Sequence, residues 1–256
     1  MSLSFEKRKI KILAMLKQEG RVQVRAIAKE LQVSDETVRR DLERLDKEGQ
    51  LKKVYGGAVK IEAKTFELPF EEKRMMNTKE KRAICKQAAE LVQEDDIIFI
   101  GNGTTPLEIV RFLGNKPKIT VITPSLPVLL LALDHFPGKI IFIGGEIDNN
   151  QKYTSGPLSE NMIRQLKANK AFIAAGGISD VNGVTDYDIN GSSISRKMME
   201  RSDEVIILAD HSKFGETAFS YMCELTDATK LITDKHCPKE WRNIVLKKGI
   251  QLYIAE

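Results

Sequence analysis

From residue 79 to the end of the chain, short apolar runs alternate with segments of helical spacing, and this alternation constrains the fold most strongly. The runs are four to seven residues long and rich in Ile and Val, as in IIFI, TVIT and KIIF. Strands that are buried on both faces are apolar at every position, and helices between them connect parallel neighbours. The pattern therefore predicts an α/β domain with a largely parallel sheet.

Four of the predicted strands end in small or polar residues. These endings are Asn102-Gly103-Thr104-Thr105, Thr123-Pro124-Ser125, Gly144-Gly145 and Asp210-His211-Ser212-Lys213. In open parallel sheets, ligands bind beyond the carboxyl ends of the strands. Backbone N–H groups and threonine hydroxyls at a helix start can also hold a phosphate. Each ending alone is more often an ordinary strand-to-helix turn, so we expect a phosphate site only where several converge.

The basic charge is concentrated in the first 60 residues. They contain 15 Lys and Arg against 9 Asp and Glu, a net charge of +6, whereas the remaining residues contain 25 against 27, a net charge of −2. This asymmetry suggests that the N-terminal part meets a polyanion. A solvated basic face is the alternative, and charge alone does not decide between them.

Apolar spacing predicts three helices in this basic part, over residues 4–20, 22–31 and 34–49, with Ser4 and Ser34 as N-caps. The residues expected to face inward in the second and third helices are Ile27, Ala28, Leu31, Val38, Leu42 and Leu45. LKKVYGGAV then predicts two short strands around Gly56-Gly57. A helix, a short turn, a capped helix and a basic hairpin are typical of a winged helix-turn-helix.

The outer face of the third predicted helix carries the candidate DNA contacts. Its N-terminal half would reach base edges in the major groove, and arginines on its flanks would contact phosphates together with the hairpin lysines. The predicted DNA-binding residues are Ser34, Glu36, Thr37, Arg39, Arg40, Arg44, Lys52, Lys53 and Tyr55. Any amphipathic helix has a charged outer face, so this helix alone would not establish DNA binding.

The stretch VSDETVRRDLERLDKEGQLKKVYGGAV closely resembles the DNA-binding signature of the DeoR-type bacterial repressors, with Tyr55 where histidine is more usual. The segments GNGTT, VITPSLPV, IGG, AFIAAGGIS, GVTDYD and LADHSKFG resemble, in order, the sensor domain of the same family. That domain is similar to the sugar-phosphate isomerase fold of ribose-5-phosphate isomerase. Gly101, Pro106 and Pro124 depart from the family pattern, which has Asp, Thr and Asn there. The resemblance implies an N-terminal winged helix-turn-helix followed by a larger α/β sensor domain.

The resemblance also implies roles for individual residues in binding a phosphorylated sugar. Gly103, Thr104 and Thr105 would hold the phosphate, and Asp210 and Lys213 would contact the sugar or its phosphate. Thr123 and Ser125 would line the pocket, while Arg74 and Lys81 match basic positions linked to the effector response. The predicted effector-binding residues are Asn102, Gly103, Thr104, Thr105, Thr123, Ser125, Gly144, Gly145, Asp210, Lys213, Arg74 and Lys81.

We predict a DNA-binding domain over residues 1–60, a linker over 61–78 and a sensor domain over 79–256. The expected partners are double-stranded operator DNA, a small phosphorylated sugar and further copies of the chain, as a dimer or a tetramer. No run approaches the ~20 apolar residues of a membrane span, and the start lacks a secretory signal, so we expect a cytoplasmic protein. The three cysteines and three histidines have no disulfide or metal spacing, and neither a metal nor a cofactor is expected.

An isomerase-like enzyme with a DNA-binding appendage is the alternative hypothesis. An aldose–ketose isomerase needs a carboxylate base within hydrogen-bond reach of the two carbons that exchange a proton. Asp186 or Asp188 fits this role by residue type. The acidic stretch and the lysine-plus-glycine run of the isomerase are not recognisable, however, so we predict a sensor with no catalytic residue.

Overall fold

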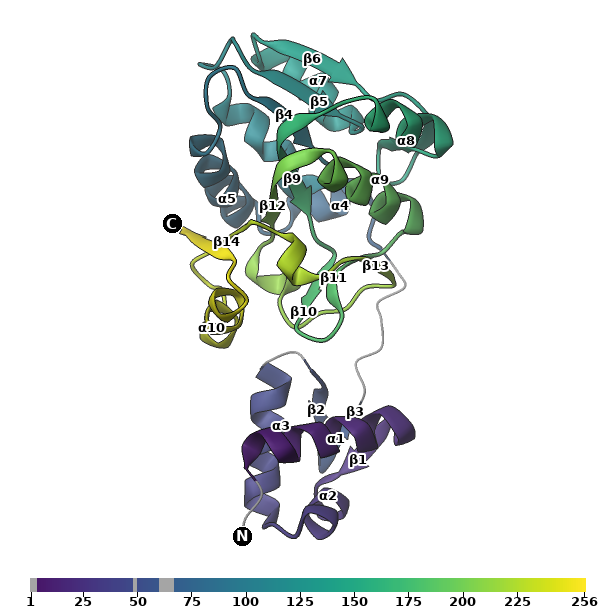
Figure 1. Ribbon diagram of the computed structural model, residues 1–256, viewed down its shortest axis with the longest axis vertical. Helices are drawn as coiled ribbons and strands as arrows, with labels where there is room; N and C mark the ends of the chain where they lie inside the picture. The colour runs from purple at the N-terminus through teal and green to yellow at the C-terminus, as the bar shows by residue number, and fades with distance from the viewer. Residues whose placement is uncertain (1–3, 48–49, 60–66) are drawn as a thin grey trace.

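The computed structural model describes residues 4–47, 50–59 and 67–256. They form a small N-terminal lobe and a larger C-terminal lobe (Figure 1). The end predicted for the third helix, at residues 48–49, lies outside the described residues, and so does the predicted domain boundary with most of the linker, at 60–66. None of the helices in the described part is long and apolar enough to cross a membrane.

The small lobe contains three helices and a three-stranded sheet. Its elements are α1 (Phe5–Glu19), β1 (Arg21–Gln23), α2 (Val24–Leu31), α3 (Asp35–Lys47), β2 (Lys52–Val54) and β3 (Gly57–Val59). Strand β3 pairs antiparallel with both β2 and β1. Strand β1 was not predicted, because three residues are too few to show a period. Gly57 is required at this pairing, since a methyl group there would lie 2.0 Å from the Val22 carbonyl oxygen.

The core of the small lobe confirms the inward-facing residues predicted for α2 and α3, all of which are buried. The apolar spacing of the first helix predicts Ile10 on its inner face, but in α1 Ile12 and Leu16 are buried whereas Ile10 is 69% exposed. Arg8 of α1 also holds Asp41 of α3 through a pair of hydrogen bonds, Nε to Oδ2 at 2.6 Å and Nη2 to Oδ1 at 2.9 Å. These contacts fix the orientation of α3 against α1.

The larger lobe is built on a seven-stranded sheet whose strand pairings are all parallel. The strands are β4 (Ile97–Ile100), β5 (Thr120–Thr123), β6 (Lys139–Phe142), β9 (Ala168–Ala174), β12 (Ser202–Leu208), β14 (Lys230–Asp234) and β15 (Gln251–Ala255). Their order is β15-β14-β12-β9-β4-β5-β6. The α/β fold predicted from the apolar runs is confirmed.

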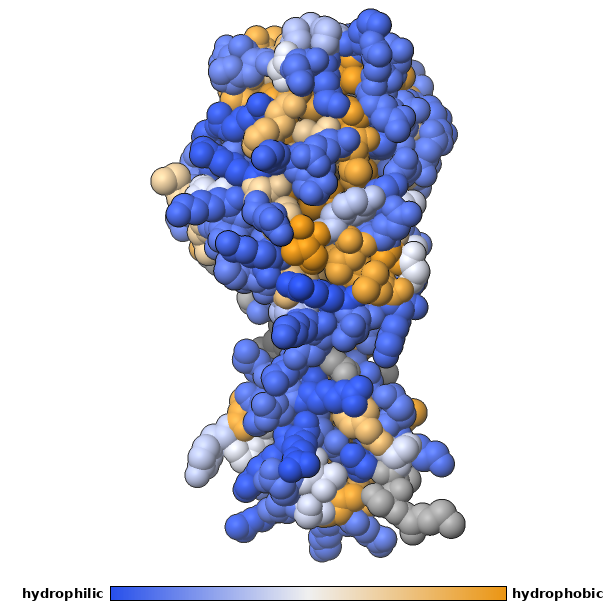
Figure 2. Space-filling view, turned by 90° about the vertical axis from the view of Figure 1, so that its left-hand side faces the viewer, coloured by the Kyte–Doolittle hydropathy of each residue, from blue (hydrophilic) through white to orange (hydrophobic). Residues whose placement is uncertain are grey.

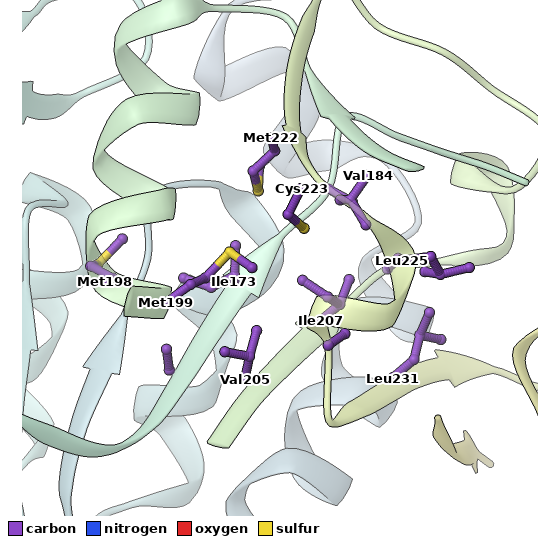
Figure 3. Close-up of a cluster of buried hydrophobic side chains, with 14 of the residues drawn as sticks. Ile173, Val184, Met198, Met199, Val205, Ile207, Met222, Cys223, Leu225 and Leu231 are labelled. Carbon is purple, nitrogen blue, oxygen red and sulfur yellow. The ribbon is translucent and has the colours of Figure 1, made fainter. Parts of the chain in front are cut away.

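Helices cover both faces of this sheet, so alternate residues of one strand enter different cores. Phe99 of β4 belongs to the core under α8 (Pro157–Arg164), α9 (Ile189–Glu200) and α10 (Lys239–Lys247). Its neighbours Ile98 and Ile100 face α5 (Thr78–Glu90) and α7 (Leu126–His135). Figure 3 shows Met199 of α9 beside Ile173, and Met198 of the same helix also belongs to this core. Burial on both faces explains why the strands are apolar at every position.

Several short elements of the larger lobe were not predicted. They are α4 (Phe70–Met75), the 3-10 helices η2 (His211–Lys213) and η3 (Leu225–Asp227), the hairpin β7 (Glu146–Asp148) and β8 (Tyr153–Ser155), and the small sheet of β10 (Gly177–Ser179), β11 (Gly183–Asp186) and β13 (Ser220–Cys223). Residues 106–113, whose spacing predicts a helix, lie in α6 (Thr104–Leu107) and the 3-10 helix η1 (Glu108–Phe112) that follows it. Helix α4 lies within the range predicted as linker, but its Phe70 is 1% exposed and belongs to the core of the larger lobe.

The two lobes also meet through a side-chain contact. Gln50, between α3 and β2, donates from Nε2 to Oδ2 of Asp180 at 3.2 Å. Asp180 follows β10 at the tip of the β10–β11 hairpin, and its Oδ1 lies 3.1 Å from Nζ of Lys248. The hairpin tip therefore contacts both the small lobe and the C-terminal part of the chain.

Candidate functional site

A polar cavity lies where the order of the large sheet changes direction. From β4 the chain adds β5 and β6 on one side, and it then returns to place β9 and β12 on the other. The loops that leave β4 and β9 diverge at their carboxyl ends, which is where parallel sheets bind ligands. The residues lining the cavity are Glu67, Lys73, Met76, Asn77, Lys81, Asn102, Gly103, Thr104, Thr105, Gln151, Tyr153, Ala174, Ala175, Gly176, Asp186, Tyr187, Asp188, Gly191, Asp210, Ser212 and Lys213.

The loop after β4 forms one end of the cavity. Gly103 has φ of +119°, a backbone conformation that other residues rarely adopt, and a methyl group there would lie 3.0 Å from Cβ of Ala174. Thr104 and Thr105 begin α6 directly after it. The amide groups in a first helical turn have no partner within the helix. This end therefore offers backbone donors and two hydroxyls to an anion.

Lysines border the same end. Lys81 of α5 is only 5% exposed, and its Nζ donates to the Lys73 carbonyl oxygen at 2.5 Å. Burial lowers the pKa of Lys81 to about 8, although the nearby Asp210 acts in the opposite direction. Lys213 of η2 lies with its Nζ 6.0 Å from the ring centre of Tyr187, and Lys73 pairs with Glu67.

Carboxylates also line the cavity. Burial raises the pKa of Asp186 to about 7, and the neighbouring Glu67 adds to this shift. Asp188 caps α9 by accepting the Gly191 N–H at 2.7 Å, and it also accepts the hydroxyl of Tyr153. Burial and this carboxylate raise the pKa of Tyr153, so its phenol stays protonated.

Asp210 connects the cavity to the segment that leads into the larger lobe. Its Oδ1 accepts hydrogen bonds from Nδ2 of Asn77 at 3.0 Å and from the backbone N–H of Ser212, also at 3.0 Å. Asn77 has φ of +48° and precedes α5 as its N-cap residue. The start of α5 is thus tied directly to the loop after β12.

The structure brings seven of the twelve predicted effector-binding residues to this cavity, namely Asn102, Gly103, Thr104, Thr105, Asp210, Lys213 and Lys81. The other five do not line it. Thr123 and Ser125 follow β5 and are buried, and the Ser125 hydroxyl accepts the Val128 N–H as the cap of α7. Arg74 lies on α4, where it pairs with Glu71 at 3.6 Å.

Gly144 and Gly145 lie outside the cavity because the β7–β8 hairpin covers the ends of β5 and β6. The Thr154 N–H of this hairpin donates to the Pro124 carbonyl oxygen at 2.9 Å. Ser159 packs closely enough on Gly145 that a methyl group on the glycine would lie 2.0 Å from Oγ. The local sequence after β5 and β6 resembled that after β4, but the sheet order places it away from the cavity.

Sequence reasoning missed some residues of the cavity. Tyr153 lies on a three-residue strand with no period, and Lys73 and Asn77 lie in the charged segment that was interpreted as linker. Asp186 and Asp188 had been considered only as bases of the alternative enzyme. The pattern DYD just before a helix start is the signal that could have placed these carboxylates in the cavity.

The described part of the chain contains no group of three or more His, Cys, Asp or Glu side chains able to hold a metal ion. His211 lies outside the cavity lining, and its Nδ1 and backbone N–H contact Asp234 at 3.1 and 2.7 Å. The three cysteines are buried free thiols. Cys85 supports the β4 loop from behind by donating its thiol proton to the Thr105 carbonyl oxygen at 2.9 Å.

The small lobe carries a second candidate surface on α3. The Ser34 hydroxyl accepts the Thr37 N–H at 3.2 Å and caps the helix start. Arg40 and Glu36 project outward with side chains 80% and 65% exposed, and their charged atoms are 3.7 Å apart. This spacing makes a weak surface pair, which leaves the guanidinium able to reach another partner.

A groove with basic side chains runs beside α3 under the wing. Arg39 of α3 and Lys53 of β2, two of the predicted DNA contacts, line it together with Arg21 and Arg25. Tyr55 is fully exposed at the tip of the wing. Arg44 differs from its neighbours because its Cζ lies 3.9 Å from the ring centre of Phe5. Lys52 is exposed on the outer strand.

A winged helix-turn-helix on one lobe and a polar cavity in the other define a class of protein, the DNA-binding transcriptional regulators with a sensor domain. Two family models match the chain, the DeoR-like helix-turn-helix domain over residues 8–64 and the DeoR C terminal sensor domain over residues 76–235. The chain belongs to the DeoR family.

Curated relatives match over nearly the full length. The HTH-type transcriptional regulator GolR of Listeria innocua is 30% identical over 249 residues, covering 97% of this chain and 98% of the relative. The lactose phosphotransferase system repressor of Staphylococcus epidermidis is 32% identical over 248 residues, covering 95% of each. Among solved structures, ribose 5-phosphate isomerase A of Methanocaldococcus jannaschii is similar with a TM-score of 0.41 and 18% identity, covering 54% of each chain.

Proposed function

We propose that this protein is a transcriptional repressor of a sugar-metabolism operon, and that it releases its operator when a phosphorylated sugar binds the cavity. The lactose system repressor among its relatives supports a sugar-linked role by its name. Such a protein works where DNA and phosphorylated sugars occur together, so we place it in the cytoplasm. No cofactor is part of the proposal.

The α3 surface supports the DNA-binding half of the proposal. Arg40 lies where a recognition helix reaches base edges, and an arginine there reads guanine through two hydrogen bonds. Arg39 and Lys53 on the groove walls suit phosphates, as do Arg21 and Arg25. Ser34 and Thr37 begin the helix, where backbone N–H groups favour a phosphate. Glu36 and Tyr55 complete the proposed interface, with the exposed Lys52.

The anion end of the cavity supports the effector half. A phosphoryl group between the Gly103–Thr105 loop, Lys81 and Lys213 would meet backbone donors, hydroxyls and ammonium groups together. Lys81 is buried and partly desolvated, so an adjacent dianion would favour its charged form. The Asp186 and Asp188 carboxylates would disfavour an anion beside them, so we expect the phosphate of the effector at the Gly103–Thr105 loop.

The observation that carries the proposal is that the segment entering the sensor lobe lines the cavity. Glu67, Lys73, Met76 and Asn77 all belong to residues 67–78, which follow the DNA-binding lobe in the chain. A ligand that moves them changes the path of the chain toward that lobe. The Gln50–Asp180 contact offers a second connection, since Asp186 lies at the base of the same hairpin. Two sites coupled in this way influence each other equally.

The experiment follows from this reciprocity. Candidate sugar phosphates are titrated into the full-length protein with and without operator DNA, and the effector should bind more weakly when the operator is bound. Identical affinities in both titrations would refute the coupling, and no binding of any sugar phosphate would refute the effector class. Gel-shift titration with the same ligand then measures the loss of operator affinity directly.

A second candidate function, sugar-phosphate isomerisation, is favoured by the pKa of Asp186. A carboxylate with a pKa of about 7 inside a cavity has the property of a general base near neutral pH. We favour the sensor because the relatives are transcriptional regulators. Turnover of pentose and hexose phosphates by the purified protein decides the matter, since turnover lost in Asp186→Asn would make the protein an enzyme.

We further infer that the protein acts as a homo-oligomer, because helix-turn-helix regulators bind paired half-sites as dimers. Helix α7 has apolar residues around its whole circumference, yet Leu130 and Leu133 are 62% and 65% exposed. A helix that is apolar all round is normally buried by other protein. In a two-fold symmetric dimer the same surface of both subunits forms the interface, so a second copy of α7 would cover it. Leu133→Glu should lower the molar mass measured by sedimentation, and an unchanged mass would exclude α7 from the interface.

A further inference from the structure

One part of the cavity lining gathers polar side chains around Gly191. A methyl group on Gly191 would lie 3.2 Å from Oη of Tyr153, 3.4 Å from Nδ2 of Asn102 and 3.5 Å from Oδ2 of Asp186. These atoms come from three segments distant in sequence, yet they face one point. Because Gly191 has no side chain, these polar atoms can lie close together in the lining of the cavity. We call Asn102, Tyr153, Asp186 and Gly191 the polar wall.

The hydrogen bonds already made within the polar wall leave acceptors unused. Asp186 accepts the Tyr187 N–H on Oδ1 at 2.9 Å, and no donor to its Oδ2 is found among the residues that the structure describes. Oδ1 of Asn102 is buried and likewise has no partner in the described part of the chain. The proton of the Tyr153 hydroxyl is used by Asp188. A ligand must therefore bring donors to this wall.

This requirement decides which part of an effector belongs at the polar wall. A phosphate dianion has no proton to donate, and the Asp186 carboxylate repels it. A sugar hydroxyl donates to a carboxylate or an amide oxygen, and it can also accept from the Asn102 amide. The lysine end suits the phosphate and the polar wall suits hydroxyls, so the ligand binds in one direction.

We propose that Asp186 and Asn102 form a hydroxyl-binding subsite that determines which phosphorylated sugar this protein accepts. The proposal rests on the sugar-phosphate function proposed above. A site built to bond a hydroxyl rejects analogues that lack it, because its polar groups are then buried without partners. The number and direction of hydroxyls at the end away from the phosphate are thus the selected features.

Neighbouring residues hold the residues of this subsite in place. Asp188 is a positioning residue, because its Oδ2 receives both the Gly191 N–H and the Tyr153 hydroxyl. Gly176 allows the close approach of Asp186, since a methyl group there would lie 3.0 Å from Oδ1. Asp188 thus fixes Tyr153 and the start of α9, while the Tyr187 N–H and the close approach of Gly176 fix Asp186.

The test is calorimetric titration of the full-length protein with ribose 5-phosphate, fructose 6-phosphate, tagatose 6-phosphate, glucosamine 6-phosphate and inorganic phosphate. For the tightest sugar phosphate, Asp186→Ala should weaken binding roughly 10- to 100-fold while leaving inorganic phosphate unaffected. Asp203→Ala is the matched control, because Asp203 lies at the opposite end of β12 in a surface pair with Lys167 at 2.7 Å. Melting curves confirm that each variant is folded.

Each other outcome overturns the subsite. Unchanged sugar-phosphate affinity in Asp186→Ala removes Asp186 from recognition, and equal losses for inorganic phosphate place it at the anion end. If glucosamine 6-phosphate alone bound, the group recognised by the subsite would be an ammonium group and not a hydroxyl. If the unaltered protein binds no sugar phosphate more tightly than inorganic phosphate, the proposed function itself fails, and this result is visible before any variant is made.

Discussion

The two lobes present their functional residues in opposite ways. In the small lobe they project from one continuous stretch, because a capped helix and the hairpin after it contain most of the proposed DNA-binding residues. In the larger lobe they come from loops between residues 67 and 213 and meet only because the sheet changes direction. A surface that reads a polymer can be continuous in sequence, whereas a cavity that encloses a small ligand must be assembled.

The contrast is tested most severely by Lys213→Ala. Removing the ammonium group from the anion end should abolish release by effector and leave operator binding unchanged, because the two surfaces belong to different lobes. Gel-shift titrations with and without the effector measure both properties. Lys235→Ala, an exposed lysine outside the cavity, is the control. Weaker operator binding in Lys213→Ala would show that the lobes are not separable.

Arg40→Ala addresses the other lobe. If Arg40 reads a guanine, specific operator affinity should fall by roughly 1–3 kcal/mol while non-specific affinity changes little. Lys52→Ala provides the comparison. Loss of a phosphate contact weakens specific and non-specific binding alike, and it lowers the slope of log affinity against log salt concentration by about one. Fluorescence anisotropy on operator and random DNA separates the cases. Equal losses on both DNAs would reassign Arg40 to the phosphates.

Asp186→Asn sharpens the comparison through stability. The pKa of Asp186 is raised to about 7 in the folded protein from an ordinary value of 3.8, so folding favours its protonated form. The stability that this gives at low pH is lost as the pH rises through 7. The variant should therefore be more stable than the parent at pH 8, on the order of 1–3 kcal/mol.

That gain should shrink as the pH falls from 7 toward 3.8, because the folded carboxyl is then protonated and no longer carries the cost of a buried charge. Urea unfolding at pH 8, 6 and 4.5 follows the trend. A destabilised variant at pH 8 would mean that the ionised carboxylate is already well accommodated in the cavity.

Lys81 gives the smallest expected effect. Its pKa is lowered to about 8, so roughly half of the ammonium groups have lost a proton at pH 8. An effector dianion raises this pKa, and binding should take up about half a proton at pH 8 and weaken as the pH rises further. Calorimetry in Tris and HEPES measures the uptake. Lys81→Arg stays charged and should show none, so uptake in that variant would point to another group.

The sequence was sufficient for those parts of the fold that repeat a pattern. The strands of the large sheet are buried on both faces, so their apolar runs were visible, and Val38, Leu42 and Leu45 marked the inner side of α3. The short β7–β8 hairpin gave no such signal, because three-residue strands show no period. The burial of Ile10 in α1 was also hard to predict, because several rows of apolar residues along that helix could have formed its inner face.

The cavity was predictable only in part, for a physical reason. The endings at Thr104 and Thr123 look alike locally, and each precedes a helix. Only the order of strands places the first at the switch between β4 and β9 and the second beneath the β7–β8 hairpin. Strand order follows from packing across the whole lobe, so local sequence could not rank the two.

The segment 67–78 has a practical consequence for anyone who wishes to exchange domains between regulators. It precedes the predicted start of the sensor domain, yet Lys73 and Asn77 belong to the cavity and Phe70 to the core beneath it. A chimaera joined at residue 78 would carry a cavity with a foreign wall and a hole in its core. One joined before residue 67 would transfer the complete binding site, and with it the choice of inducer.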